Sequence, residues 1–294
     1  MSEEELFSQG HSACAGCGSA LAIRYALKAA GKDTIVVQST GCMEVISTAT
    51  PLSAWQVPYI HTAFECGPAD ASGIDRALKK LGRRKNVNIL VFAGDGGTFD
   101  IGLQSLSGMI ERGHKVCYVC NDNEAYMNTG IQRSGSTPKY AYTTTTPFGK
   151  KIHAKQEYKK PLPFILAAHR MPYVATASVA YPQDFVKKVK KALSQDGPSY
   201  VQIFSPCVPG WKYDPSQTIA IAKIAVETGV TPLYEIEHGK FILTKKFDKF
   251  NPVKEYYKTQ GRFKGMDEKE LTEMQKHVDN EWKFLLSKEN DYFF

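Results

Sequence analysis

Residues 91–130 read VFAGDGGTFDIGLQSLSGMIERGHKVCYVCNDNEAYMNTG, and this stretch decides the fold. One apolar run ends at the GDG of residues 94–96, and a second apolar run, residues 115–121, leads into the NDN of residues 121–123. The amphipathic stretch between them, residues 101–112, predicts a helix. Strand, helix and strand in this order predict a βαβ unit of a parallel sheet. Both strand ends would lie at the carboxyl edge of that sheet, where α/β folds bind ligands.

The same alternation extends over most of the first 215 residues. Short apolar runs at residues 34–40, 173–179 and 200–205 predict further strands, and residues 19–30 and 182–194 predict amphipathic helices. Such a pattern is typical of an α/β fold in which helices cover both faces of a parallel sheet.

The pattern changes near residue 215. Beyond it we predict a helix over residues 217–228 and another over 267–286, in a segment rich in Lys, Glu, Tyr and Phe. We therefore predict a ligand-binding domain over residues 1–215, followed by a C-terminal extension, 216–294, that wraps the core or a partner subunit.

Charge and hydropathy restrict the class of protein. The net charge is +7, but basic pairs such as Lys159-Lys160 are scattered, and no nucleic-acid-binding motif accompanies them, so we interpret them as solvated surface rather than a nucleic-acid site. The sequence contains no run of about 18 apolar residues, so no membrane span is predicted. The acidic N-terminus does not resemble a secretory signal. We expect a cytoplasmic protein whose cysteines are kept reduced.

The strand-end motifs favour a diphosphate and a divalent cation. Asp95 and Asn123 offer the hard oxygen ligands that Mg²⁺ or Ca²⁺ prefers. Gly94, Gly96 and Gly97 permit close approach of the backbone, and a helix beginning near Phe99 would offer free N–H groups to phosphate. The 24 residues between GDG and NDN match the spacing of the thiamine diphosphate signature. A structural turn is the weaker alternative.

The residues after this motif extend the candidate site. Asn121 belongs to the same strand end, and we predict that it contacts the cofactor. Asn128 lies five residues beyond Asn123, close enough to reach a thiazolium ring and a bound 2-oxo acid. A type I turn with an Asx cap is the alternative for Asn128-Thr129-Gly130. Tyr126 is interpreted either as a pocket residue or as ordinary core.

Four of the seven cysteines form a candidate metal site. Cys14 and Cys17 lie in a glycine-rich loop before a helix, whereas Cys42 and Cys207 each follow a predicted strand. Four thiolates suffice for a [4Fe–4S] cluster or for Zn²⁺. One CxxC pair with two distant single cysteines differs from the two close pairs of a zinc ribbon, and this spacing favours a cluster.

The other three cysteines are interpreted as packing residues. Cys117 and Cys120 lie three apart in an apolar strand, so their side chains would point to opposite faces of the sheet. Cys66 is assigned to loop packing, although a pocket thiol is an alternative. His11 and His61 have no role assigned from sequence.

Together, CAGCGSALA, STGC, GDGG, NDNEAYMNTG and SPCVPGW resemble the β subunit of 2-oxoacid:ferredoxin oxidoreductases, over residues 8–215. The resemblance is greatest to the pyruvate-specific members. It implies a thiamine diphosphate-binding fold of the pyrophosphate-binding type. It also implies an enzyme that oxidatively and reversibly decarboxylates a 2-oxo acid with coenzyme A, releasing acyl-CoA and CO₂ and reducing ferredoxin.

The resemblance also implies roles for individual residues. It assigns Asp95, Asn123 and the backbone carbonyl of Ala125 to Mg²⁺, and Asn128 to the reacting centre. It assigns Cys14, Cys17, Cys42 and Cys207 to a [4Fe–4S] cluster, and it also places Cys42 against the cofactor. Where some relatives carry an acidic residue that touches the cofactor, this chain has Ser19, which puts that one contact in doubt.

Such a chain would be part of a larger enzyme. No glutamate can be assigned from sequence to N1′ of the cofactor, and in the resembling family this residue comes from the α subunit. The sequence has no eight-cysteine ferredoxin pattern either, so we expect γ and ferredoxin-like δ subunits as further partners, with ferredoxin as the electron acceptor.

Three alternatives remain open from sequence. The substrate could be a branched-chain 2-oxo acid, 2-oxoglutarate or oxalate instead of pyruvate. The chain could belong to a non-oxidative thiamine diphosphate enzyme with incidental cysteines. A nucleic-acid-binding metal module is the most distant alternative, because it leaves the spacing of GDG and NDN unexplained.

Overall fold

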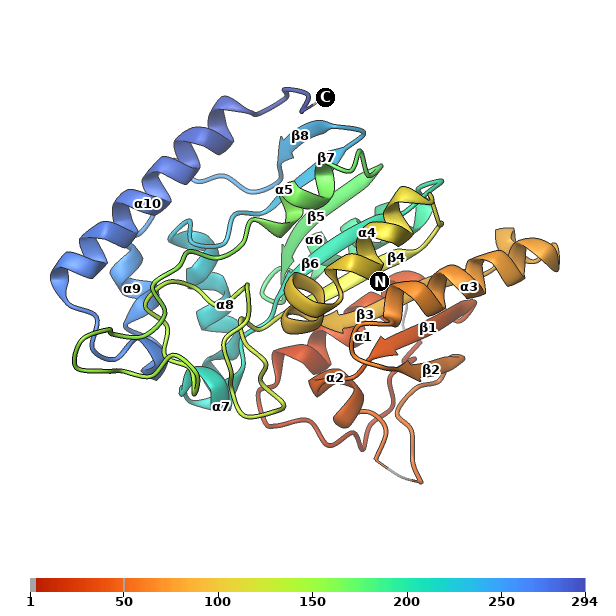
Figure 1. Cartoon of the computed structure of the whole chain (residues 1–294), viewed down its shortest axis with the longest axis horizontal. Coiled ribbons are helices and arrows are strands. Elements are labelled where there is room, and N and C mark those ends of the chain that lie inside the picture. The colour runs from red at the N-terminus through yellow and green to blue at the C-terminus, as the bar shows by residue number, and fades with distance from the viewer. Residues whose placement is uncertain (1–3, 50, 294) are drawn as a thin grey trace.

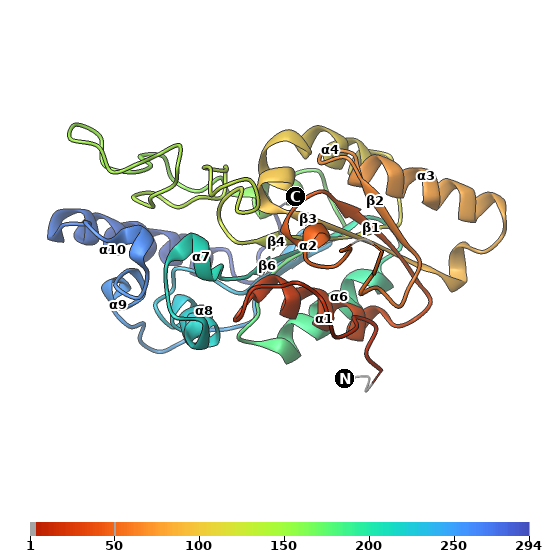
Figure 2. The ribbon, with the colours of Figure 1, turned by 90° about the horizontal axis from the view of Figure 1, so that it is seen from below.

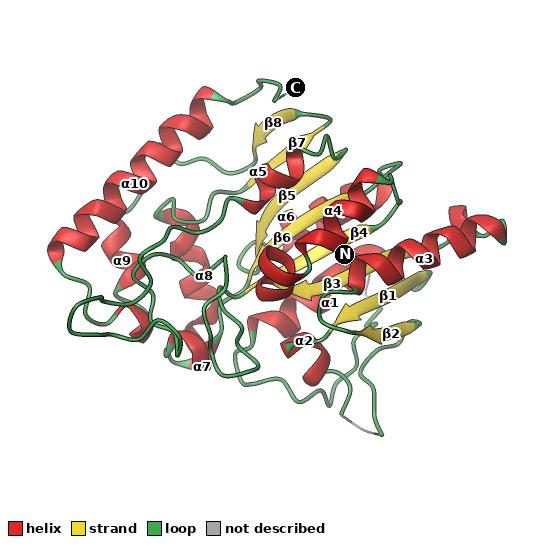
Figure 3. Cartoon of the chain, in the orientation of Figure 1, coloured by secondary structure: helices red, strands yellow, loops and turns green. Residues whose placement is uncertain are grey.

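The computed structural model describes residues 4–49 and 51–293, and its centre is an eight-stranded sheet (Figures 1 and 3). The spatial order of the strands is β2-β1-β3-β4-β6-β5-β7-β8. Their bounds are β1 Thr34–Ser39, β2 Tyr59–Thr62, β3 Asn88–Gly94, β4 Cys117–Asp122, β5 Tyr173–Ser178, β6 Ser199–Phe204, β7 Tyr234–Glu237 and β8 Lys240–Leu243.

The first six strands in that order are parallel. Every residue of β4, β5 and β6 is buried, because helices cover both faces of a parallel sheet and leave neither side of these strands to water. The five strands predicted from sequence are confirmed, whereas β2 was missed. It is only four residues long and its pattern includes the exposed Ile60 and His61.

The remaining two strands form an antiparallel hairpin that extends the sheet beyond β5. Sequence reasoning missed this hairpin because its strands are short and contain Glu235, Glu237 and Lys240. His238 and Gly239 form its turn, with φ of 47° and 82°. Two successive residues with positive φ match the twist of a tight hairpin. Residues beyond 215 therefore contribute to the same sheet as the predicted ligand-binding domain.

Helices cover both faces of the sheet. Figure 2 shows α3 and α4 on one side, and α1, α6 and α8 on the other. The helix bounds are α1 Gly18–Ala30, α2 Cys42–Val45, α3 Gly67–Lys80, α4 Leu103–Glu111, α5 Leu162–Ala167, α6 Pro182–Ser194, α7 Val208–Trp211, α8 Thr218–Glu227, α9 Val253–Tyr257 and α10 Glu268–Ser287. The helices predicted near residues 19–30, 182–194, 217–228 and 267–286 are confirmed.

Helix α10 begins with a reciprocal cap. The side chain of Asp267 accepts a hydrogen bond from the Glu270 N–H, and Glu270 in turn accepts one from the Asp267 N–H. These bonds satisfy two backbone donors at the helix start. Among residues 4–49 and 51–293, no helix is both long and apolar enough to cross a bilayer.

A long irregular segment, residues 123–161, connects β4 to α5 and packs against α10. Glu273 of α10 accepts hydrogen bonds from Lys139 Nζ (2.5 Å), the Tyr140 hydroxyl (2.7 Å) and the Tyr158 hydroxyl (2.9 Å). Hydrogen bonds from Lys139 and the two tyrosines lower the pKa of Glu273 to about 2. The C-terminal helix thus holds a segment that begins at the carboxyl end of β4.

We predict that Glu273→Gln loosens this segment without unfolding the sheet. The neutral amide removes the charge that strengthens three hydrogen bonds, each of which contributes on the order of 1 kcal/mol. Amide hydrogen exchange in residues 139–158 should become about fivefold faster. Glu281→Gln on the same helix is the control, because the hydrogen bonds from Lys139, Tyr140 and Tyr158 go to Glu273 and not to Glu281. Equal exchange in the two variants would contradict the anchoring role.

Candidate active site

A cavity opens at the carboxyl ends of β1, β3 and β4, at the sheet edge predicted from the strand-end motifs. It is lined by residues 38, 40–43, 64, 94–97, 121, 123 and 125–129. Four separate parts of the chain thus meet there: the end of β1 with α2, Phe64 after β2, the GDG turn, and the segment that begins at NDN.

The GDG turn passes directly from strand to helix. Strand β3 ends at Gly94, and Asp95 is already helical, four residues before the predicted start near Phe99. The Gly102 N–H bonds to the Gly97 carbonyl at 2.9 Å, which makes Gly97–Ile101 a π-helical turn. A Cβ on Gly96 would lie 2.6 Å from the Tyr126 ring. Glycine therefore allows the aromatic ring to close over the turn.

Asp95 is fully buried at this strand end. Burial raises the pKa of its carboxyl well above the usual value, and the neighbouring Asp122 raises it further, although a hydrogen bond from the Ser134 hydroxyl acts in the opposite direction. A buried carboxylate is costly unless it is paired with a cation or strong donors. This environment favours a bound cation beside Asp95.

Asn123 and Ala125 bring two more oxygens to the same place. One terminal atom of the Asn123 side-chain amide lies 2.9 Å from the Ala125 carbonyl oxygen and 3.0 Å from Asp95 Oδ1. With nitrogen there, the amide donates to both oxygens. With oxygen there, three oxygens face one another, which is the donor set that a hard cation such as Mg²⁺ requires. The residues present therefore fit a divalent cation.

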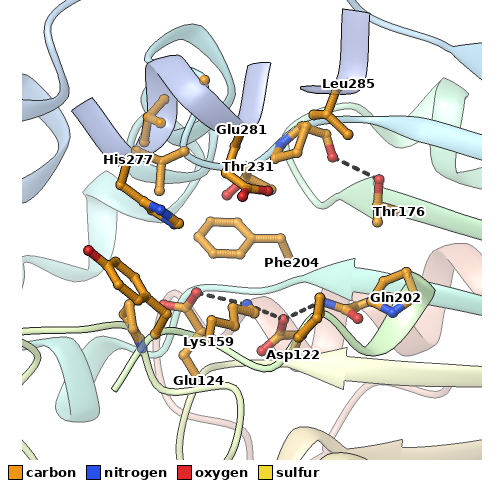
Figure 4. A pocket seen from close by; sticks show the side chains of 18 of the residues that line it. Asp122, Glu124, Lys159, Thr176, Gln202, Phe204, Thr231, His277, Glu281 and Leu285 are labelled. Atoms are coloured by element: carbon orange, nitrogen blue, oxygen red, sulfur yellow. Dashed lines mark hydrogen bonds and ion pairs between the residues drawn. The ribbon is translucent and has the colours of Figure 1, made fainter. Parts of the chain in front are cut away.

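A charge cluster, in which Asp122 and Glu124 are buried and Lys159 is half-buried, lines a second cavity (Figure 4). Lys159 Nζ is 2.6 Å from Asp122 Oδ2 and 3.0 Å from Glu124 Oε1. Gln202 Nε2 also donates to Asp122 Oδ2 at 2.7 Å. Burial opposes the charge of Glu124, but Lys159 and Arg262 together lower its pKa. The side chains on each side of Asn123 are thereby fixed.

Asn128 and Tyr126 lie on the open side of the cavity. Asn128 is exposed at the rim, whereas Tyr126 is half-buried and its hydroxyl donates to the Gly96 carbonyl (3.1 Å) and to Asp100 (3.0 Å). Of the two interpretations considered for Tyr126, the structure places it in the cavity wall. The exposed amide of Asn128 is accessible to a ligand that enters from this side.

The four cysteines assigned to a cluster gather near one end of this cavity. Cys42 begins α2 and lines the cavity, Cys17 precedes α1, and Cys207 precedes α7. Burial raises the pKa of Cys42 and of Cys207 to about 12, and the thiols of Cys14 and Cys17 add to both shifts. The four groups are therefore within electrostatic reach of one another.

The four thiols do not have the mutual geometry of a metal site in this structure. Across residues 4–49 and 51–293, no group of three or more His, Cys, Asp or Glu side chains is arranged to hold a metal ion. The loop of Cys14 and Cys17 is nevertheless fixed from outside. Thr218 donates to the Gly16 carbonyl at 2.6 Å, and a Cβ on Gly16, which has a φ of 72°, would lie 2.3 Å from the Pro215 carbonyl oxygen.

Ser19 and Asn121, both considered as cofactor contacts from sequence, form a hydrogen bond with each other. The Asn121 amide donates to the Ser19 hydroxyl at 2.9 Å and accepts a hydrogen bond from the Ser205 hydroxyl at 2.7 Å. Asn121 lines the cavity, whereas Ser19 lies buried behind it and outside its lining. Ser19 thus fixes the strand end at which Asn121 lies.

Comparisons with known proteins give the family. Residues 36–203 match the thiamine pyrophosphate enzyme, C-terminal TPP binding domain. The chain is 52% identical to pyruvate synthase subunit PorB of Methanocaldococcus jannaschii over 288 residues, which cover 96% of this chain and 97% of that one. It is 49% identical to ketoisovalerate oxidoreductase subunit VorB of Pyrococcus abyssi, covering 96% and 93%.

The chain belongs to the 2-oxoacid:ferredoxin oxidoreductase β-subunit family.

A solved structure agrees with this β-subunit fold. The 2-oxoglutarate:ferredoxin oxidoreductase from Magnetococcus marinus superimposes with a TM-score of 0.59 over 93% of this chain and 97% of that one, at 22% identity. The expected thiamine diphosphate-binding α/β fold is confirmed.

The β subunit also contains positions that sequence reasoning misjudged or missed. Lys159, interpreted as solvated surface, is tied to Asp122 and Glu124, so that interpretation is wrong. No sequence pattern indicates these ion pairs, because the partners of Lys159 lie 35 and 37 residues away in the chain. Ser134, which donates a hydrogen bond to Asp95, was missed because it too is distant in sequence from its partner.

The remaining cysteines and histidines of the β subunit lie as follows. Cys117 and Cys120 are buried in β4, as predicted, and burial raises the pKa of Cys117 to about 12. Cys66 is half-buried at the start of α3. His11 stacks on Phe7 and its Nδ1 accepts from the Ala13 N–H at 3.4 Å. The exposed His61 contacts the Thr40 hydroxyl at 2.7 Å.

Proposed function

We propose that this chain is the β subunit of an enzyme that oxidatively decarboxylates pyruvate with coenzyme A, yielding acetyl-CoA and CO₂ and reducing ferredoxin, in a reversible reaction. The observation that carries the proposal is the meeting of two donor sets at one sheet edge. The oxygens of Asp95, Asn123 and Ala125 line one wall of the cavity. Four thiols of suitable softness for iron gather beside it.

Thiamine diphosphate and Mg²⁺ would be held by the strand-end motifs. In this proposal Asp95, Asn123 and the Ala125 carbonyl bind Mg²⁺, and the backbone of the GDG turn approaches the diphosphate. Asn121 and the surface of Cys42 complete the floor, and Asn128 faces the reacting atoms. When bound, the cofactor supplies the carbanion chemistry that cleaves a bond next to a carbonyl group.

The thiols of Cys14, Cys17, Cys42 and Cys207 would hold a [4Fe–4S] cluster. They come from three separate segments, so cluster binding requires the folded domain. Because Cys42 also lines the cofactor cavity, cluster and cofactor would share one wall. That proximity suits transfer of electrons from the cofactor site toward ferredoxin and distinguishes this enzyme from a non-oxidative one.

Partner subunits would complete the site. Asn128 is exposed at the cavity rim. The α2 helix, whose first two residues line the cavity, ends at Val45, an apolar side chain that is 47% exposed. Exposed apolar side chains are common at protein interfaces. We propose that the α subunit covers this side, that γ and δ subunits complete a cytoplasmic complex, and that nucleic acid and membrane have no part in it.

Asp95→Ala should reduce Mg²⁺-dependent binding of thiamine diphosphate by more than about 100-fold, because it removes the one carboxylate of the proposed ligand set. Calorimetric titration of the purified complex with cofactor, with and without Mg²⁺, measures the loss. Asp279→Ala on the surface of α10 is the control. Tight binding retained in Asp95→Ala would refute the ligand assignment.

Cys207→Ser should remove or convert the cluster, whereas Cys117→Ser should leave it intact. Both changes replace one thiol by a hydroxyl, but only Cys207 lies beside the other three predicted ligands. Anaerobic analysis should give about four iron and four sulfide per chain in Cys117→Ser, with an unchanged EPR signal of the reduced protein. Zinc, or no metal, in the unmodified chain would instead favour a non-oxidative thiamine diphosphate enzyme.

A substrate panel decides between pyruvate and the branched-chain alternative, which the relationship to a ketoisovalerate oxidoreductase subunit makes the second candidate. The reconstituted complex is assayed with coenzyme A, a viologen acceptor and pyruvate, 3-methyl-2-oxobutanoate, 2-oxoglutarate or oxalate. We expect kcat/KM for pyruvate to exceed the others by at least about tenfold, since one or two extra methyl groups change pocket binding by roughly 1–3 kcal/mol. A higher value for the branched acid would reject pyruvate.

A further inference from the structure

The segment after Cys207 makes direct contact with the backbone that carries the proposed Mg²⁺ ligands. Trp211, the last residue of α7, is completely buried, and its indole N–H donates to the Asn123 carbonyl at 2.8 Å. One residue earlier, Gly210 lies so close to Met127 that a Cβ would stand 2.2 Å from the Met127 sulfur. The short helix therefore touches the 123–127 segment at two points.

Arg262, from the C-terminal extension, packs behind this contact. Its guanidinium lies 3.7 Å from the centre of the Trp211 ring, and Nη2 donates to Glu124 Oε2 at 2.6 Å. Gln260 Oε1 accepts from Arg262 Nε at 2.8 Å. Arg262 is only 2% exposed. A planar group that stacks and donates at once suits arginine better than lysine.

The backbone held in this way has an unusual conformation. Glu124 has a φ of 66°, in the left-handed region that a non-glycine residue seldom occupies. The reversal at Glu124 lets the side chain of Asn123 and the carbonyl of Ala125 face the same point. Such a conformation persists only where the surroundings hold it. Here Arg262 and Lys159 hold the Glu124 side chain, and Trp211 holds the preceding carbonyl.

We propose that Trp211 and Arg262 are positioning residues that hold the 123–125 backbone in the geometry that binds Mg²⁺. This inference rests on the proposed function, and it goes beyond it by giving the C-terminal extension a part in cofactor binding. Trp211 acts through the carbonyl of Asn123, and Arg262 acts through the Trp211 ring and the Glu124 carboxylate. Neither side chain lines the cofactor cavity.

Trp211→Phe tests the proposal, because phenylalanine keeps an aromatic ring for Arg262 but lacks the indole N–H. Trp282→Phe is a matched control. Trp282 is buried too, and its indole N–H also donates to a backbone carbonyl at 2.8 Å, that of Gly229, but it lies on α10 away from the cavity. Both variants therefore lose the same kind of bond.

The dissociation constant of Mg²⁺ is measured by calorimetry on the complete, metal-depleted complex in the presence of thiamine diphosphate. We expect Trp211→Phe to raise this constant about 10–100-fold, as loss of a residue that orients a metal ligand does. Trp282→Phe should change it less than about twofold, even where both variants lower the melting temperature equally. Equal constants in the two variants, or no change in Trp211→Phe, would overturn the proposal.

Arg262→Lys provides a second variant that keeps the positive charge beside Glu124. We expect about a tenfold weaker Mg²⁺ affinity, and a combined Trp211→Phe and Arg262→Lys effect smaller than the product of the single effects, because the two residues act on the same backbone. Independent, multiplicative effects would contradict a shared role. If the unmodified complex shows no Mg²⁺-dependent cofactor binding, the proposed function fails together with this inference.

Discussion

The structure around the cavity depends on the burial of negative charge at two neighbouring strand ends. Asp95 follows β3 and Asp122 ends β4, both fully buried, and burial raises the pKa of each carboxyl. Buried carboxylates in this proximity require cations or strong donors. The chain supplies Lys159 to Asp122 on one side. On the other side the Asn123 side-chain amide lies between Asp95 and the Ala125 carbonyl oxygen, where the proposed cation would complete the site.

Much of this arrangement could be predicted from sequence because it is local. The strands and helices follow from hydrophobic periodicity, and the carboxyl edge of a parallel sheet brings their ends together whatever the intervening residues are. Asp95 and Asn123 could therefore be placed at one site, although they lie 28 positions apart in the chain. The hairpin β7–β8 could not be predicted in the same way, since its strands are short and polar and gain stability from pairing with β5.

What sequence could not predict is the support behind the site. Lys159 and Arg262 look like ordinary members of a basic, solvated surface, yet each contributes a positive charge to the buried Glu124. Arg262 lies 138 residues from Glu124 in the chain, and no periodic pattern relates positions so far apart. The left-handed conformation of Glu124 has no sequence signal either, because a glycine or asparagine would be the expected residue there.

These supports change how the C-terminal extension is understood. A segment whose only task was to cover the core would bury apolar side chains, as Trp282 and Leu285 of α10 do. This extension also buries a charged group, Arg262. Burial of a charge is unfavourable unless an opposite charge and hydrogen bonds compensate it. The partner of that charge is Glu124, which lies between Asn123 and Ala125, two of the three residues proposed to bind the cation. In this proposal, binding of the cation, folding of the extension and placement of the segment after Cys207 are linked through one short stretch of backbone. Selection for cofactor binding would then act on residues well outside the predicted ligand-binding domain.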